Sequence, residues 1–107
     1  MFKIHQCKGF HFGVNDITVS VQFGYGNYCD NYNNRDDIEK RGDPTLQVES
    51  SDAEIAIWLN GGEWITGQFM SEVLNEEPDD VRGHCTPEVV LKALNWANNY
   101  PHKEGLR

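Results

Sequence analysis

The chain has no apolar run longer than a few residues, and its start, MFKIHQCKGF, lacks the apolar stretch of a secretory signal. A helix that crosses a bilayer needs about 20 consecutive apolar residues, so no membrane segment is predicted and a cytoplasmic protein is expected. The three cysteines form no CxxC pair, which fits reduced thiols in a reducing compartment better than a disulfide framework.

Basic residues are also scarce: 9 Lys and Arg stand against 17 Asp and Glu, for a net charge of −8. The imbalance is local, because residues 1–29 sum to +1, residues 30–81 to −11 and residues 82–107 to +2. A negative field of this size disfavours direct nucleic-acid binding, since proteins that bind a phosphate backbone carry a basic stripe. It favours a partner protein with a basic surface, or it serves solubility alone.

The pattern that is present is mostly strand, within a length of 107 residues that predicts one domain over 1–107. Apolar and polar residues alternate on both sides of Asn15-Asp16, which predicts a β-hairpin over residues 8–24. From Gly24 to Pro44 the alternation stops, and we expect a long loop with one helical turn at most.

A second hairpin is predicted from Ile55–Leu59 and Trp64–Phe69, joined by a tight turn at Asn60-Gly61-Gly62. Across that turn Trp58 and Trp64 fall on the same face. A strand-like stretch begins earlier, at Leu46 and Val48. The following residues, 70–85, are ambiguous and fit a short helix near Ser71 to Asn75 and a brief edge strand around Val81.

The last predicted element is a helix that begins at Thr86 and Pro87, an N-cap residue followed by a proline suited to the first helical position. Apolar residues then recur at helical spacing until Asn98-Asn99 and Pro101 close the pattern. The fold class predicted is α+β: an antiparallel sheet of four to five strands, made of two hairpins, with one C-terminal helix packed on one face.

Metal and cysteine chemistry have little support in the spacing. Six possible metal ligands lack any CxxC or HxxxH arrangement: His5, Cys7, His11, Cys29, His84 and Cys85. No metal site and no cofactor are therefore expected. The best hint of an enzyme is Cys85, because a helix N-terminus directly after it would lower the pKa of its thiol. Cysteines are more often simply buried, so no enzyme and no catalytic residue are predicted.

The loop after the first hairpin is the best candidate for a binding surface, because it alternates glycine, tyrosine and asparagine between Gly24 and Asn34. Tyrosine and tryptophan supply flat contact area with a polar tip, and the carboxylates of the acidic segments would steer a basic partner. The predicted binding residues are Tyr25, Asn27, Tyr28, Asn31, Tyr32, Trp64, Asp36, Asp37, Glu76 and Glu77.

Three segments together resemble a group of small uncharacterised proteins of bacteriophage genomes: VSVQFGYGNYCDN, SSDAEIAIW with the Gly-Gly-Glu-Trp turn, and DVRGHCTPEVVLKALNWA. The most specific part is VQFGYGNYC, Val21 to Cys29. The resemblance implies a phage-encoded protein of the host cytoplasm, and it brings no activity and no catalytic residue.

The function expected from these observations is binding: a small acidic phage-type protein that occupies a host protein and inhibits or modulates it. The target expected is a defence or nucleic-acid-handling factor with a basic surface. One alternative is a protein that binds or sequesters a nucleotide-like signal in the Gly24 to Asn34 loop. A further alternative is a minor structural phage protein. A homodimer is also open, formed through an edge strand or through the face that carries the tryptophans.

Overall fold

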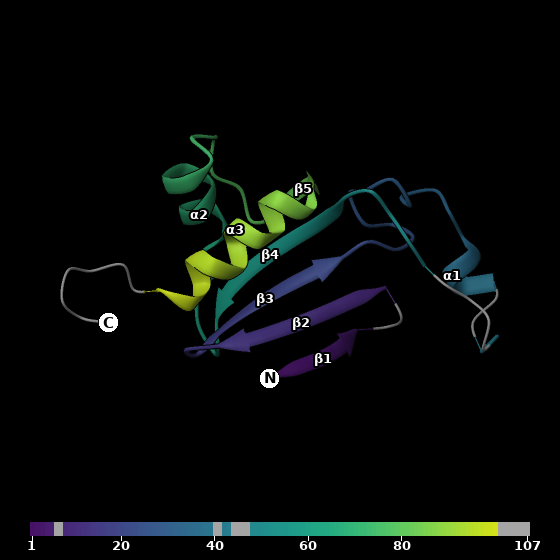
Figure 1. The fold of residues 1–107 in the computed structure, drawn as a ribbon, viewed down its shortest axis with the longest axis horizontal. Helices are drawn as coiled ribbons and strands as arrows, with labels where there is room; N and C mark the ends of the chain where they lie inside the picture. The colour runs from purple at the N-terminus through teal and green to yellow at the C-terminus, as the bar shows by residue number, and fades with distance from the viewer. Residues whose placement is uncertain (6–7, 40–41, 44–47, 101–107) are drawn as a thin grey trace.

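The computed structural model describes residues 1–5, 8–39, 42–43 and 48–100. They form one five-stranded antiparallel sheet in the order β1-β2-β3-β4-β5, so each strand pairs with its neighbour in sequence (Figure 1). The strands are β1 (Phe2–His5), β2 (Gly9–Val14), β3 (Ile17–Gln22), β4 (Ala53–Leu59) and β5 (Arg82–Cys85). The helices are α1 (Asp36–Glu39), α2 (Thr66–Val73) and α3 (Pro87–Asn98).

The predicted first hairpin is confirmed as β2 and β3. Asn15 and Asp16 connect the strands with positive φ angles of 53° and 61°, the conformation of the two-residue turn that matches the twist of a hairpin. Asparagine and aspartate tolerate this left-handed backbone better than other non-glycine residues. The turn is also fixed from outside, because the Asn15 side chain donates to the carbonyl oxygen of Asn98 at the end of α3 (2.6 Å).

The hydrophobic core lies between the middle of the sheet and α3 with α2, as the α+β prediction required. The inward positions of β3 and β4 are apolar at every second residue and almost fully buried, and Phe69 of α2 and Trp96 of α3 meet over them with ring centroids 5.7 Å apart. The N-terminus of α3 is as predicted: Thr86 is the N-cap, its side chain accepts from the Val89 amide, and Pro87 opens the helix. The predicted stop at Pro101 lies outside the described residues.

The strand predicted over Trp64–Phe69 is wrong. After the turn that follows β4, Trp64 makes a single bridge to Trp58 and the chain then enters helix α2 at Thr66. The helix is favoured because Ile65, Phe69 and Met70 become one buried face at helical spacing, whereas in an extended chain Met70 would point away from Phe69. The Thr66 hydroxyl provides a hydrogen bond that a paired strand would otherwise have made with β4, since it accepts from the Ile57 amide (2.8 Å).

Other predicted elements are shifted or new. The brief edge strand near Val81 is β5, one residue later, and the helical turn in the long loop is α1. Val48 is not in a strand, and Leu46 lies outside the described residues. Strand β1 was not predicted. Phe2 and Ile4 do alternate with Lys3 and His5, but four residues at a sheet edge give a short pattern.

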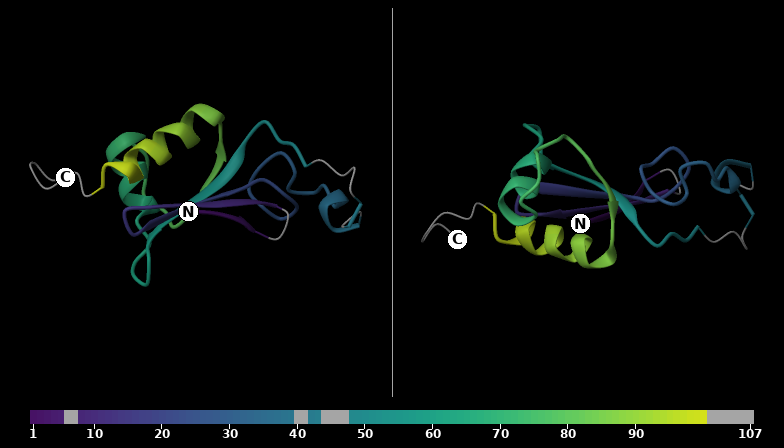
Figure 2. Two further views of the ribbon diagram at one scale, coloured as in Figure 1. Left: turned by 60° about the horizontal axis from the view of Figure 1, so that its bottom comes forward. Right: turned by 90° about the horizontal axis from the view of Figure 1, so that it is seen from above.

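The helices cover one face of the sheet and only part of it. Figure 2 shows α2 and α3 on the same side, over the β3 to β5 half, while α1 lies apart at the far end of the long connection between β3 and β4. Phe2 and Ile4 of β1 are on the same face of the sheet as the helices. They are nevertheless 78% exposed each, because the helices do not extend over β1. Within the described residues no helix is long and apolar enough to cross a membrane.

Candidate functional site

The loop after β3 is held by its own asparagines. The Asn31 side chain is buried and donates to the carbonyl oxygens of Phe23 (2.7 Å) and Glu49 (2.8 Å). The Asn27 amide donates to Glu54 (3.1 Å) while its oxygen accepts from the Gly24 amide (3.0 Å). These two predicted binding residues therefore have a structural task, because their hydrogen bonds close the loop onto β4 and the segment before it.

The hollow inside this loop is small. It measures about 90 Å³ and is lined by Gly24, Tyr25, Asn31, Asn34, Asp36, Val48 and Glu49. Small-molecule pockets are typically about 300 to 1,000 Å³, so a nucleotide does not fit there. Tyr25 lies at its rim with the Arg35 guanidinium 5.0 Å from its ring centroid.

The other two loop tyrosines form a pair at the surface. The rings of Tyr28 and Tyr32 are stacked with centroids 5.8 Å apart, and both are about half exposed. The loop reaches β5 here, because the His84 amide donates to the Tyr28 carbonyl oxygen (2.9 Å). Gly83 is needed at this approach, since a Cβ added to it would lie 2.7 Å from the Cβ of Tyr28.

Trp64 lies in a different place, beside a cleft formed by α2 and the segment before β5. The cleft has a volume of about 420 Å³ and is lined by Glu63, Trp64, Ile65, Gly67, Gln68, Ser71, Glu72, Pro78, Asp79 and Asp80. Trp64 is 51% exposed, and its ring is stacked on that of Trp58 at 5.3 Å, as the face assignment predicted. The cleft therefore combines an exposed aromatic ring with four carboxylates.

None of the four predicted acidic residues lines this cleft. Glu76 is paired with Arg82 (2.7 Å), and that hydrogen bond lowers the pKa of the Glu76 carboxyl. Glu77 is exposed and does not line the cleft. Asp36 and Asp37 lie in α1. The carboxylates beside Trp64 include those of Asp79 and Asp80, which were not predicted. Pro78 brings this segment against Gly67 of α2, where an added Cβ would lie 2.9 Å from Pro78.

A second hollow continues the cleft toward the tyrosines. It measures about 370 Å³ and is lined by Tyr28, Met70, Asp79, Val81, Arg82, Gly83 and His84. Asp79 belongs to both hollows. The predicted anchors Trp64 and Tyr28, which are far apart in sequence, thus line two hollows that meet at Asp79. We call the surface formed by these two hollows the acidic band.

Two cysteines lie among the described residues, and both are buried. Cys85 is fully covered and Cys29 is 2% exposed, and burial raises the pKa of both thiols. The helix start after Cys85 was expected to lower the pKa of its thiol, but burial raises that pKa instead. Buried thiols with a raised pKa are poor nucleophiles.

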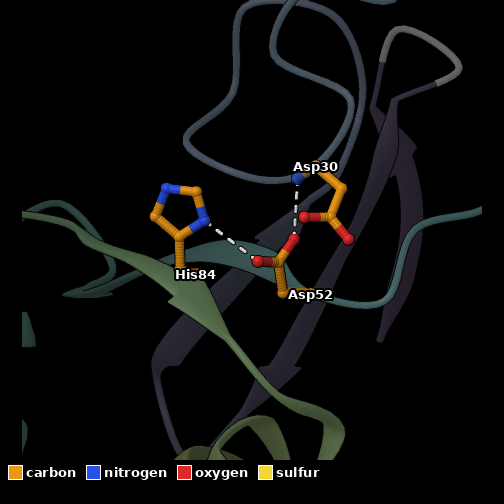
Figure 3. A group of neighbouring side chains, drawn as sticks. All are labelled: Asp30, Asp52 and His84. Carbon is orange, nitrogen blue, oxygen red and sulfur yellow. Dashed lines mark hydrogen bonds and ion pairs between the residues drawn. The ribbon is translucent and has the colours of Figure 1, made fainter.

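One group of candidate functional side chains was missed at the sequence level: Asp30, Asp52 and His84. His84 Nδ1 lies 2.9 Å from Asp52 Oδ2, and Asp52 Oδ1 accepts from the Asp30 amide at 2.7 Å (Figure 3). Asp30 lies in the loop after β3, Asp52 lies directly before β4, and His84 lies in β5. Because they are so far apart in sequence, no local spacing could have revealed them. Of these three residues, only His84 was among the candidate ligands considered from the sequence.

The fold and these surfaces define an α+β domain with an open sheet edge and an acidic, aromatic surface band. Comparison with known proteins identifies no relative: no protein-family model, no curated protein and no solved structure matches the chain.

Proposed function

We propose that this protein binds a basic surface of another protein and acts by occupying it, as a phage-type inhibitor or modulator of a host defence or nucleic-acid-handling factor. The phage context rests on the sequence resemblance. The observation that carries the binding proposal is the acidic band: half-exposed Trp64 stands beside a cleft with the carboxylates of Glu63, Glu72, Asp79 and Asp80.

The cleft suits a lysine or arginine side chain for two reasons. An exposed indole attracts a cation to its face, most strongly where the cation loses water, and the nearby carboxylates add charge of the opposite sign. Within the described part of the chain, none of the ion pairs joins a lysine or arginine to these four carboxylates. Glu72 is held by neutral donors, the Gln68 amide (2.9 Å) and the Trp96 indole (3.3 Å).

The charge distribution favours the same partner. The carboxylates of residues 30–81 give this part of the chain a net charge of −11, and a field of one sign speeds association with a surface of the other sign. Trp64 and Tyr28 then supply the aromatic contact area that carries most binding energy in protein interfaces.

Affinity capture from host lysate at low and moderate salt tests this function. We expect the wild-type chain to retain one host protein in a salt-sensitive manner. The variants Trp64→Ala and Asp79→Asn/Asp80→Asn should lose it, because each removes part of the cleft without touching the core.

The matched control is Asp16→Asn/Glu88→Gln, which also removes two negative charges. These lie at the hairpin turn and at the start of α3, away from the cleft. Retention by this control and loss by the cleft variants would locate binding in the acidic band. Equal retention by all four proteins, or capture unaffected by salt, would refute the proposed function.

A further inference from the structure

Three side chains with metal-ligand chemistry converge beside the acidic band. One ligand atom each of Asp30, Asp52 and His84 lies within 4.8 Å of the other two. Figure 3 shows that the carboxylates and the imidazole turn their polar ends toward the same space. We propose that these residues form a binding site for a divalent transition-metal ion of the zinc or manganese class.

The ligand set is mixed rather than merely acidic. An imidazole nitrogen combined with carboxylate oxygens is a donor set of zinc, manganese and iron sites, whereas calcium and magnesium sites are built from oxygen alone. When each ligand is about 2.1 Å from the metal, adjacent ligands lie about 3.0 Å apart around an octahedral ion and about 3.4 Å apart around a tetrahedral one. The 2.9 Å between His84 Nδ1 and Asp52 Oδ2 matches the octahedral spacing.

Charge also favours an ion at this position. Two carboxylates lie close together, and one imidazole balances at most one of them even when it is protonated. Asp52 is mostly buried, with a side chain 14% exposed, while His84 is 66% exposed. A divalent cation would balance both carboxylates, and the exposed side of His84 leaves room for water to complete the coordination.

The backbone holds the group in place without an ion. His84 has a left-handed φ of 52°, and its amide is bonded to Tyr28 while its carbonyl oxygen accepts from Arg82 Nη1 (3.2 Å). Asp52 is fixed by the Asp30 amide. A ligand set that is already oriented costs less ordering entropy when the ion binds.

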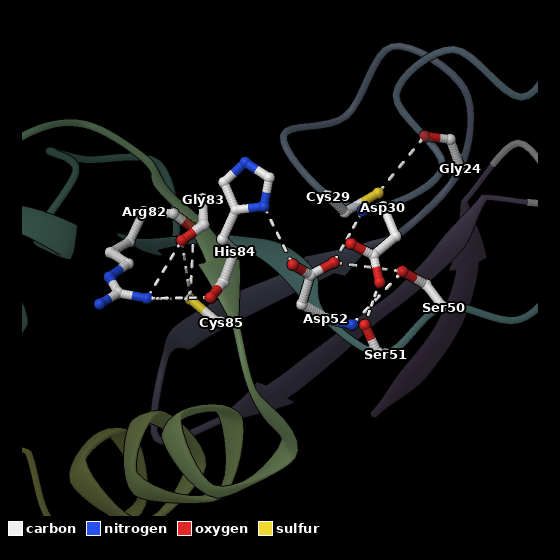
Figure 4. Close-up of polar contacts among 10 residues, drawn as sticks. All are labelled: Gly24, Cys29, Asp30, Ser50, Ser51, Asp52, Arg82, Gly83, His84 and Cys85. Carbon is white, nitrogen blue, oxygen red and sulfur yellow. Dashed lines mark hydrogen bonds and ion pairs between the residues drawn. The ribbon is translucent and has the colours of Figure 1, made fainter.

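Hydroxyl groups surround the carboxylates as outer partners. The Ser51 hydroxyl donates to Asp30 Oδ2, and the Ser50 hydroxyl donates to Asp52 Oδ1 (3.3 Å), as Figure 4 shows. Hydrogen bonds to ligating carboxylates are the usual support of a metal site, because they fix the orientation of the ligand.

Calorimetric titration of the purified chain with MnCl₂ and with ZnCl₂ is the test, read together with manganese-induced broadening of NMR signals. We expect one manganese ion per chain, with broadening centred on residues 30, 52 and 84. Manganese is included because it has little affinity for thiolates, so the three cysteines do not confuse the result.

Two variants remove a ligand with little change to the fold. Asp30→Asn keeps the backbone amide that binds Asp52, and His84→Asn keeps a residue that tolerates the left-handed backbone. Each should weaken manganese binding by at least about tenfold, the loss expected when a metal site is damaged. The control variants His5→Asn and Glu77→Gln change a histidine and a carboxylate outside the group and should bind manganese as the wild type does.

Absence of manganese and zinc binding at millimolar concentration would overturn the proposal, and so would unchanged affinity in Asp30→Asn and His84→Asn or broadening centred on α1. The outcome is separable from that of the proposed function, because the cleft variants at Trp64, Asp79 and Asp80 leave all three ligands in place.

Discussion

Two asparagine side chains fasten the loop after β3 to β4 and to the segment before it. Asn31 bonds two carbonyl oxygens, and Asn27 bonds Glu54 and the Gly24 amide. From sequence, asparagines among tyrosines indicate a recognition loop as readily as a braced one, because the same amide bonds a ligand or a backbone. Only the three-dimensional partners distinguish the two.

At the residue scale we predict that the thiols of Cys29 and Cys85 are unreactive in the folded chain. Both are buried, and burial raises the pKa of each. A disulfide-exchange reagent at pH 8 should therefore modify them only after denaturant is added, with Cys7→Ser as the background so that only these two thiols are counted. Rapid modification of Cys85 in the native protein would reopen the enzymatic alternative.

At the scale of elements, sequence reasoning succeeded where the pattern was local and long. The hairpin of β2 and β3 and the helix α3 carry their periodicity, turn and cap within the segment itself. It failed at α2, where Ile65 and Phe69 fit either a strand or a helix, and burial of Met70 against the core decides for the helix. It also missed the triad of Asp30, Asp52 and His84, whose proximity depends on the fold of three elements.

The contact between β5 and the loop gives the element-scale prediction. Gly83→Ala places a Cβ 2.7 Å from the Cβ of Tyr28, so the loop must move away from β5. We expect a loss of about 1 to 3 kcal/mol in the free energy of unfolding, as for overpacked sites, measured by urea denaturation. Gly62→Ala is the control, because its added Cβ would be 3.4 Å from the nearest atom and should change stability little. Equal effects of the two substitutions would contradict this account.

In the molecule as a whole, the helices cover only part of the sheet and the negative charge is concentrated in one part of the chain. The helices shield β3 to β5 and leave β1 at an open edge, whereas the acidic residues belong to the middle of the chain. An apolar groove of about 460 Å³ continues from β2 and β3 to α3, where Leu91 is 59% exposed. Unprotected strand edges with exposed apolar side chains tend to pair with other chains.

At this scale we predict weak self-association through the edge strand β1. Ile4→Lys places a charge among the exposed apolar side chains of β1 and should shift sedimentation velocity profiles at high concentration toward the monomer. Lys3→Gln, on the opposite face of the strand, should leave them unchanged. A wild-type chain that sediments as a monomer at every concentration would exclude this mode of pairing.

The centre of the sheet has a consequence for how the chain reaches its fold. β3 and β4 pair most extensively, yet Gln22 and its partner Glu54 are 32 positions apart in sequence. The strands β2 and β3 are close in sequence and pair across a two-residue turn, whereas β4 can pair with β3 only after the long connection between them has closed. The entropy of closing such a loop grows only with the logarithm of its length, by about 0.6 kcal/mol per doubling. The part of the connection between Asn34 and Val48, beyond the asparagines that fasten the loop, can therefore lengthen or shorten over evolutionary time while the sheet stays the same.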